Sequence, residues 1–244
     1  MIMVRRLVAG ELDVAICVTE GLVAGVAQNP ELCLFGTYVE SPLPWAISVG
    51  VGAKYSSIDD LAFGATFGIS RAGSGSEVMA KYACSLYEWK GAPKFKVLGD
   101  VNGLIGGVQE GQADAFLWER TTMQRHYDRN EVRYLGTVRP PWPAFSFGAT
   151  REFVQGSARV QGFLEGVRVA IGRFMDLDAS EREAFVVDTL GYSTSDVQQW
   201  LGYVRFSGDC AVDPKRTQAV VAALQRAGVI DQIDAADIVA PLPI

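Results

Sequence analysis

The chain has 244 residues, of which 49% are apolar and 20% are charged, and its formal net charge is −6. This composition is typical of a globular protein with one large or two small domains. The acidic balance argues against nucleic acid as a partner, because phosphate binding needs clustered Lys and Arg. No apolar run approaches the roughly 18 residues of a membrane span, so we expect no membrane insertion.

The first ten residues have neither the apolar core nor the cleavage site of a signal peptide, so we expect a cytoplasmic location. The four cysteines, Cys17, Cys33, Cys84 and Cys210, form no Cys-x-x-Cys pair. We interpret them as reduced, mostly buried thiols. With a single histidine in the sequence, we expect no metal site and no cofactor.

The first elements expected are a nearly buried strand over residues 12–18 and a short helix over 19–28, with Thr19 as its N-cap. Residues 31–50 form a long extended stretch. Its two Ser-Pro and Leu-Pro steps suit a connection between lobes better than a central strand.

The section that follows alternates helices with strands. Helices are expected at 57–63, 74–89, 101–110 and 121–129, and strands at 66–70, 94–98 and 113–118. This alternation indicates βαβ units and a parallel sheet.

A second extended segment, 131–150, precedes a purely helical region. Its helices are expected at 152–176, 179–190, 193–204 and 214–227, the last capped by Asp213. The fold class is therefore α/β, with two lobes joined by two hinge crossings and a helical C-terminal tail. We predict a split lobe of residues 1–45 and 136–244, a continuous lobe of residues 46–135, and a small-molecule site in the cleft between them.

One candidate binding segment lies between a strand and a helix and contains Ser70, Arg71, Ser74, Gly75 and Ser76. Small residues let the backbone approach a ligand, and helix-start N–H groups favour an anion or a polar acceptor. The alternative is a plain Gly-Ser turn with a capped helix.

Two further candidates, Thr19-Glu20 and Trp118-Glu119, follow strands, and ligands of open α/β sheets gather at such ends. The alternatives are a helix cap with a favourable first-turn Glu and, for the second pair, a core aromatic with a solvated Glu. Tyr38, in the first crossing, is a further candidate.

Trp142 is the candidate of the second crossing, where the alternative is a packing aromatic on a rigid connector. Signs of catalysis are sparse. His126 lies in a charged helix and is interpreted as solvated surface, and no cysteine has an obvious histidine partner. Glu20 and Glu119 could form a carboxylate pair across the cleft.

In chain order, several pieces together resemble type II periplasmic substrate-binding proteins of the nitrate/sulfonate/bicarbonate and thiamine-pyrimidine-precursor (NMT1/THI5-like) branch. The pieces are Gly10–Ile16, Thr19–Gly21, Gly36–Ile47, Ser70–Ser76, Ala113–Glu119 and Pro141–Pro143. The resemblance implies a non-catalytic solute-binding protein, similar to the binding components of ABC transporters. It also implies a ligand that is either a sulfonate- or nitrate-like anion or a pyrimidine precursor of thiamine. The residues it places at the cleft are Thr19, Glu20, Ser70, Arg71, Ser74, Ser76, Trp118, Glu119 and Trp142.

This sequence departs from the family at its beginning, where members carry a strand and helix before the segment matched by residues 1–10. An incomplete sheet would favour pairing with a second copy, so a homodimer through this lobe is expected as one way to complete it. Two alternatives to solute binding stay open. One is an enzyme on the same scaffold, as in menaquinone-pathway enzymes and pyrimidine synthases, although the cysteine-rich motif and active-site histidine of the synthases are absent. The other is a ligand-free interaction module.

Overall fold

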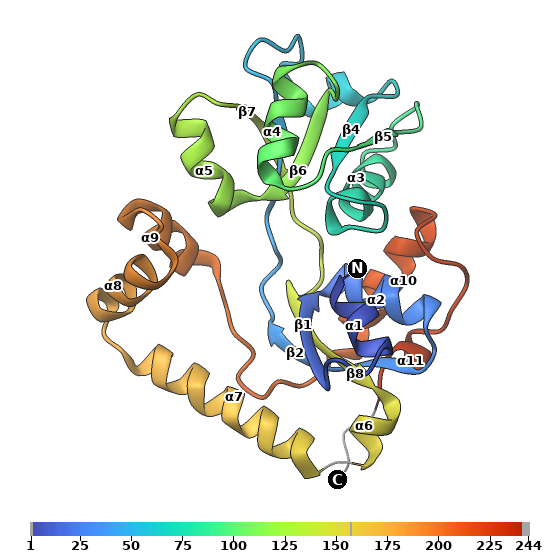
Figure 1. The fold of residues 1–244 in the computed structure, drawn as a ribbon, viewed down its shortest axis with the longest axis vertical. Coiled ribbons are helices and arrows are strands. Elements are labelled where there is room, and N and C mark those ends of the chain that lie inside the picture. The colour runs from blue at the N-terminus through green and yellow to red at the C-terminus, as the bar shows by residue number, and fades with distance from the viewer. Residues whose placement is uncertain (1, 157, 241–244) are drawn as a thin grey trace.

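A computed structural model describes residues 2–156 and 158–240, which form two lobes built on separate β-sheets (Figure 1). Sheet A has the order β1-β8-β2, and sheet B has the order β5-β4-β6-β3-β7. The strands of sheet A precede and follow those of sheet B in the sequence: β1 and β2 come before β3, and β8 comes after β7. This arrangement is the two-lobed α/β architecture that the sequence predicts, while the lobe boundaries at 45/46 and 135/136 stay a prediction.

Sheet A is antiparallel, with β8 between its two partners. Its strands are β1 (Val14–Val18), β2 (Leu32–Val39) and β8 (Phe145–Thr150). The helices of this lobe are α1 (Ile2–Val8), α2 (Thr19–Gln28), α6 (Arg151–Gly156), α10 (Pro214–Arg226) and α11 (Ala235–Ile238). The apolar side chains of α1, α2 and α10 share one core cluster with β1 and β2. The same cluster continues into the second lobe through Val78, Met79 and Tyr82 of the helix that follows residue 74, which contacts α2.

Sheet B is mixed: β4 runs parallel to β5 and β6, whereas β3 is antiparallel to β6 and β7. Its strands are β3 (Trp45–Val49), β4 (Thr66–Ile69), β5 (Lys94–Val97), β6 (Ala115–Glu119) and β7 (Arg133–Val138). Its helices are a short 3₁₀ turn (Ile58–Leu61), α3 (Gly75–Leu86), α4 (Val101–Gln109) and α5 (Arg120–Asp128). The parallel βαβ core is as predicted, and the two antiparallel additions are not.

The two extended stretches were interpreted too broadly as connections. Residues 31–50 contain β2 and β3, and both strands are almost wholly buried. Residues 131–150 contain β7 and β8, and β8 is the central strand of sheet A. Only 40–44 and 139–144 cross between the lobes. The prolines that suggested long connectors lie in these two short crossings, where no ladder hydrogen bond is lost.

The helical region forms an arm of α7 (Ala158–Asp176), α8 (Ala179–Leu190) and α9 (Thr194–Tyr203). Figure 1 shows the arm leaving the lobe of sheet A and reaching α5 of the other lobe. The single helix expected over 152–176 is wrong: α6 ends at Gly156 and α7 begins at Ala158. Asp213 caps α10 as predicted, accepting from the N–H groups of Lys215 and Arg216.

Candidate functional site

The start of α2 places a carboxylate in the contact between the lobes. Glu20 is only 1% exposed, and the indole N–H of Trp142 donates to its Oε2 at 3.0 Å. Its other oxygen, Oε1, is buried without a hydrogen-bond partner. Burial raises the pKa of Glu20 to about 7, against the smaller opposing effects of its own backbone N–H and of Trp142. A carboxyl with this pKa changes charge near neutral pH.

The side chains around Glu20 come from both lobes. Trp142 belongs to the second crossing, is fully buried, and meets the ring of Tyr82 in α3 edge-on at 4.8 Å between centroids. At the start of α3, Gly75 lies so close to Trp45 that an added Cβ would be 2.9 Å from the ring. We call this contact region of Glu20, Trp142, Tyr82, Trp45 and Gly75 the inter-lobe seam. In this conformation the lobes are packed directly against each other there.

Thr19 lies at the same end of α2, but the role expected for it as N-cap is wrong. The cap position is Val18, which has no capping side chain, and Thr19 is the first helical residue. Its Oγ1 instead lies 2.8 Å from Oγ of Ser146 in the neighbouring strand β8. This hydrogen bond ties the start of α2 to sheet A. The first N–H groups of α2 therefore have no side-chain cap.

The serines of residues 70–76 hydrogen-bond within their own turn. Ser76 Oγ accepts from the N–H of Ser70 at 3.1 Å and lies 2.9 Å from Oγ of Ser74, which is the N-cap residue of α3. Both Ser74 and Ser76 are buried. Nε of Arg71 is buried without a partner, as is Nε1 of Trp45 in the seam. The segment is therefore a turn held by its own serines, in which Ser74 makes no side-chain cap to α3 and Arg71 Nε is an unpaired donor.

The pair Trp118-Glu119 does not reach Glu20 through any described contact. Glu119 caps α5: its Oε1 accepts from Thr121 N–H at 2.7 Å and its Oε2 from Thr122 N–H at 2.6 Å. Tyr203 of α9 also donates to it, at 3.2 Å. Trp118 packs on the core cluster between α4 and sheet B. The carboxylate pair considered from sequence is therefore not formed in this conformation.

Tyr38 lies away from the seam as well. Its ring packs on Phe147 and Phe206, at centroid distances of 5.7 and 5.4 Å, and it lines a groove beneath the arm. None of five cavities in the described part of the chain is lined by residues 70–76 or 118–119. Of the sequence-predicted residues, Glu20 and Trp142 are thus in direct contact, and none of these five cavities is lined by two of the predicted residues together.

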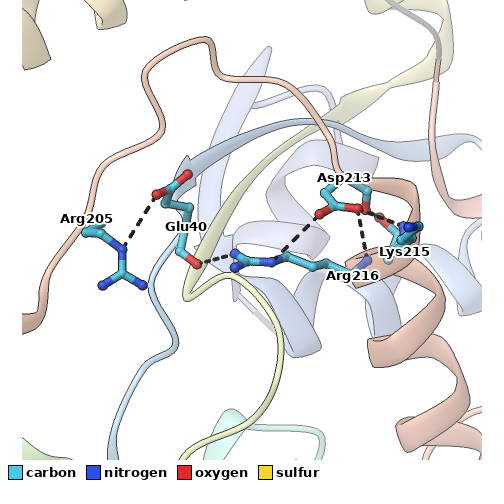
Figure 2. A network of polar contacts seen from close by, with 6 residues as sticks. Glu40, Arg205, Asp213, Lys215 and Arg216 are labelled. Carbon is cyan, nitrogen blue, oxygen red and sulfur yellow. Dashed lines mark hydrogen bonds and ion pairs between the residues drawn. The ribbon is translucent and has the colours of Figure 1, made fainter.

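A polar cavity of about 270 Å³ adjoins the first crossing. Thr37, Ser207 and Arg216 line it, and a cavity of about 10 Å³ that shares Thr37 and Arg216 extends to Thr19 and Ser146. Figure 2 shows that three charged residues of its lining, Glu40, Asp213 and Arg216, belong to one network of ion pairs and hydrogen bonds. This cavity was not predicted, because its residues lie far apart in the sequence and carry no motif.

The paired charges in Figure 2 fasten the C-terminal region to the first crossing. Arg216 donates to the carbonyl oxygen of Glu40 at 2.6 Å, and its Nε lies 3.8 Å from Asp213. Arg205 Nε lies 3.7 Å from the Glu40 carboxylate, and the backbone N–H groups of Glu40 and Ser41 donate to the carbonyl of Arg205. The crossing therefore moves together with residues 205–216.

His126 is not solvated surface, contrary to the sequence interpretation. It is 6% exposed, and its Nδ1 lies 2.6 Å from Glu131, a structural pair at the end of α5. Its burial depends on how α5 packs on sheet B, which the charge pattern along the segment could not show. Within residues 2–156 and 158–240, no three His, Cys, Asp or Glu side chains are grouped to hold a metal ion. No helix of these ranges is long and apolar enough to cross a bilayer.

Comparison with known proteins places the fold. A family model described as Ca3427-like periplasmic binding protein matches residues 45–138, which are 94 of the 244 residues. A search of curated proteins found no match. Among solved structures, a Candida albicans protein described as defining a new family with the generic periplasmic binding protein fold aligns with a TM-score of 0.86. It is 24% identical, and the alignment covers 99% of this chain and 84% of that one.

Two sulfonate-binding proteins align more distantly. The periplasmic aliphatic sulphonate binding protein SsuA of Escherichia coli has a TM-score of 0.72 and 16% identity, covering 99% of this chain and 79% of that one. The alkanesulfonate-binding SsuA of Xanthomonas axonopodis pv. citri, solved bound to MOPS, aligns with a TM-score of 0.77 and 15% identity. The alignment covers 98% of this chain and 84% of that one. The chain therefore has the periplasmic-binding-protein fold, as the resemblance implied. Its assignment to the NMT1/THI5-like branch stays a prediction.

Proposed function

We propose that this protein binds a small polar solute between its lobes and belongs with the Ca3427-like binding proteins. The observation that carries the proposal is the buried Glu20 carboxyl, with one oxygen unpartnered at the contact between two lobes that only two short crossings join. Leaving such a group unsatisfied costs about 1–3 kcal/mol or more. A ligand that donates a hydrogen bond to Glu20 would remove that cost. Two-lobed proteins generally close around a ligand held between their lobes, which here is the position of the inter-lobe seam.

The chemistry of the seam favours a ligand with N–H donors at one end and an acceptor at the other. Glu20 is acceptor-only when ionised, and its described side-chain partner is a neutral indole. An anion placed next to it would be repelled. The start of α3, with Ser74 and the half-buried Arg71, offers donors at the other end. Aminopyrimidines match this polarity better than nitrate, and sulfonates match it only if they also carry an amine.

Binding requires the lobes to separate, because the seam is filled by Trp142, Trp45 and Tyr82 in the closed arrangement. Opening would expose Glu20 to water and lower its pKa, and a bound donor would take the place of the lost contacts. The free protein therefore exchanges between a packed and an open arrangement, and the ligand selects the latter before the lobes close on it.

A thermal-shift screen tests the proposal, with aminopyrimidines, alkanesulfonates, amine-bearing sulfonates and nitrate at pH 6 and pH 8. A ligand at 100 times its Kd should stabilise the wild-type protein by about 2.7 kcal/mol. The Glu20→Gln variant should lose most of that effect. Glu119→Gln is the matched control, since it alters a carboxylate that caps α5 outside the seam, and it should keep the response.

The outcomes separate the parts of the proposal. Stabilisation by nitrate or simple sulfonates alone would keep solute binding and refute the donor-bearing ligand. Equal loss in both variants would remove Glu20 from the site. No stabilisation by any compound at millimolar concentration would refute the binding function.

An enzyme on this scaffold is the second candidate, and the pKa of Glu20 is the observation that favours it. A carboxylate poised near pH 7 can act as a general base. Its described neighbours supply an indole and a phenol, from Trp142 and Tyr82, and no second carboxylate or nucleophile. Turnover of a compound found in the screen, abolished in Glu20→Gln while binding persists, would establish this role.

A further inference from the structure

The polar cavity of about 270 Å³ beside the first crossing is lined by two buried hydroxyls that differ in their hydrogen bonding. Thr37 of β2 and Ser207 are 5% and 3% exposed. The hydroxyl of Ser207 donates to Oδ1 of Asp209 at 3.2 Å. The hydroxyl of Thr37 has no hydrogen-bond partner among the described residues. Because buried polar groups are nearly always paired, a hydroxyl left open on a cavity indicates a ligand that pairs with it.

The side chain of Thr37 faces this cavity because of its position in sheet A. Thr37 lies opposite Ser146 of β8, and directly opposed side chains of antiparallel strands point to the same face of the sheet. Both residues line the adjoining cavity of about 10 Å³, and Thr37 lines the larger cavity as well. Ser146 is satisfied by Thr19, whose Oγ1 lies 2.8 Å from its Oγ. Thr37 is therefore left to pair with a ligand in the cavity.

Three carboxylates, from Glu40, Asp209 and Asp213, also line the cavity, and among the described lining residues a single guanidinium, that of Arg216, opposes them. Asp213 is occupied, because it caps α10 and lies 3.8 Å from Nε of Arg216 (Figure 2). Arg216 is occupied as well, since it also donates to the carbonyl oxygen of Glu40. The Glu40 carboxylate has a looser pair, with Arg205 at 3.7 Å, in which both side chains are exposed. Three negative groups and one positive group give the lining a net charge of −2.

Asp209 contributes the least compensated of these negative charges. Its Oδ1 accepts from the hydroxyl of Ser207 and, at 2.8 Å, from the N–H of Ala211. Its Oδ2 has no partner in the part of the chain that the structure describes. Arg168 contacts the backbone carbonyl of Asp209 and pairs its own charge with Glu165. One carboxylate oxygen of Asp209 is therefore available to a donor in the cavity.

We propose that this cavity binds a small organic cation through a primary ammonium group. An ammonium has three N–H donors and no acceptor, and Thr37, Asp209 and Glu40 present acceptor oxygens to it. The net negative charge of the lining favours a cation over an anion. Glu40 belongs to the first crossing and Asp209 to the segment that is fastened to it, so the bound ammonium would add a further link between the two.

Two other occupants fit the lining less well. A metal ion is disfavoured, because no three His, Cys, Asp or Glu side chains of residues 2–156 and 158–240 are grouped to hold one. An anion would use the start of α10, where N–H groups attract negative charge, but the carboxylate of Asp213 already accepts from these N–H groups. An organic ammonium is thus the class of ligand that the described groups favour.

The proposal does not depend on solute binding at the inter-lobe seam, and calorimetric titration tests it. The probe is ethanolamine at pH 7.5, where an alkyl ammonium with a pKa of about 10.4, as in lysine, is charged. Ethanolamine should bind saturably at one site, whereas ethylene glycol, which is of similar size but uncharged, should not bind. The Asp209→Asn variant keeps the acceptor Oδ1 and removes the charge, so it should weaken ethanolamine binding by about tenfold or more.

Thr37→Val is the second variant, because it keeps the shape of the side chain and removes the hydroxyl. It should weaken ethanolamine binding by about tenfold, the effect of one lost hydrogen bond to a charged group. Thr66→Val, at a half-buried position of β4 in the other lobe, is the matched control and should bind ethanolamine as the wild type does. Glu20→Gln should also keep full affinity for ethanolamine, because Glu20 lies in the inter-lobe seam.

Several results would overturn the proposal. The absence of saturable ethanolamine binding at millimolar concentration would refute the site, and equal binding of ethylene glycol would refute the ammonium as the recognised group. Unchanged affinity in both Asp209→Asn and Thr37→Val would place ethanolamine elsewhere, and a loss in Glu20→Gln alone would place it in the seam. Displacement of ethanolamine by Mg²⁺ or by acetate would assign the cavity to a metal ion or to an anion instead of an organic cation.

Discussion

The Glu20→Gln substitution should make the protein more stable at neutral and alkaline pH and leave it unchanged at acidic pH. Burial raises the pKa of Glu20 from an ordinary value of 4.5 to about 7. The folded protein therefore binds a proton that the unfolded chain releases. The stability associated with the neutral carboxyl is fully present below pH 4.5 and is lost as the pH rises through 7. The difference between these two pKa values corresponds to a change of about 3 kcal/mol in the free energy of unfolding, at about 1.4 kcal/mol for each tenfold change in proton affinity.

Urea denaturation of both proteins at pH values from 4.5 to 8.5 measures this effect. Gln is isosteric with Glu and stays neutral, so its carbonyl can still accept from Trp142. The difference in free energy of unfolding, variant minus wild type, should be near zero at pH 4.5. It should rise to about 3 kcal/mol by pH 8 and then level off. Background titration of other groups cancels in this difference. A difference that stays flat with pH, or that falls as the pH rises, would refute the buried, uncompensated carboxylate.

Three further predictions concern the two places where the lobes meet. The Gly75→Ala substitution puts a Cβ 2.9 Å from the Trp45 ring, so it should overpack the α3 side of the seam and lower the free energy of unfolding in urea by about 1–3 kcal/mol. Gly106→Ala, whose Cβ would meet nothing, should not. Tyr203→Phe removes the hydrogen bonds of α9 to Thr121 and Glu119, so it should cost about 1–2 kcal/mol and speed amide exchange in α8 and α9. Trp142→Phe removes the donor to the buried carboxylate, so the pH-dependent loss of stability should still begin near pH 4.5 but continue to a higher pH than in the wild type, in the same denaturation assay.

Local patterns allowed much of the fold to be predicted. The strand over β1, the helix from Thr19 to Gln28 and the βαβ section up to α5 follow from period-two and period-3.6 apolar spacing, which depends on near neighbours alone. The cap at Asp213 follows from its position before Pro214. Apolar spacing cannot predict the direction in which two strands pair. β3 pairs antiparallel with β6, with Ile47 opposite Leu117, and no local pattern encodes a pairing between residues so far apart in the sequence.

The contacts of the candidate site could be anticipated from sequence only in part, for the same reason. Glu20 and Trp142 were both chosen from sequence, but their hydrogen bond joins residues 122 positions apart, and the burial that shifts the Glu20 pKa depends on both lobes. Glu119 shows the converse. Its place after a strand is equally typical of a ligand contact and of a helix cap. The N–H groups of Thr121 and Thr122 take both of its oxygens, which only the folded geometry reveals.

The two contacts between the lobes differ in how well their polar groups are satisfied, and this difference decides where the molecule opens. At the arm, Tyr203, Thr121 and Glu119 form a connected set of hydrogen bonds. At the seam, Glu20 keeps an oxygen without a partner and carries a charge above pH 7 that water would solvate better. Separating the seam relieves that cost, whereas separating the arm breaks satisfied bonds. The lobes should therefore rotate about the two crossings with α9 held on α5, which opens the face that contains Glu20 and the start of α3.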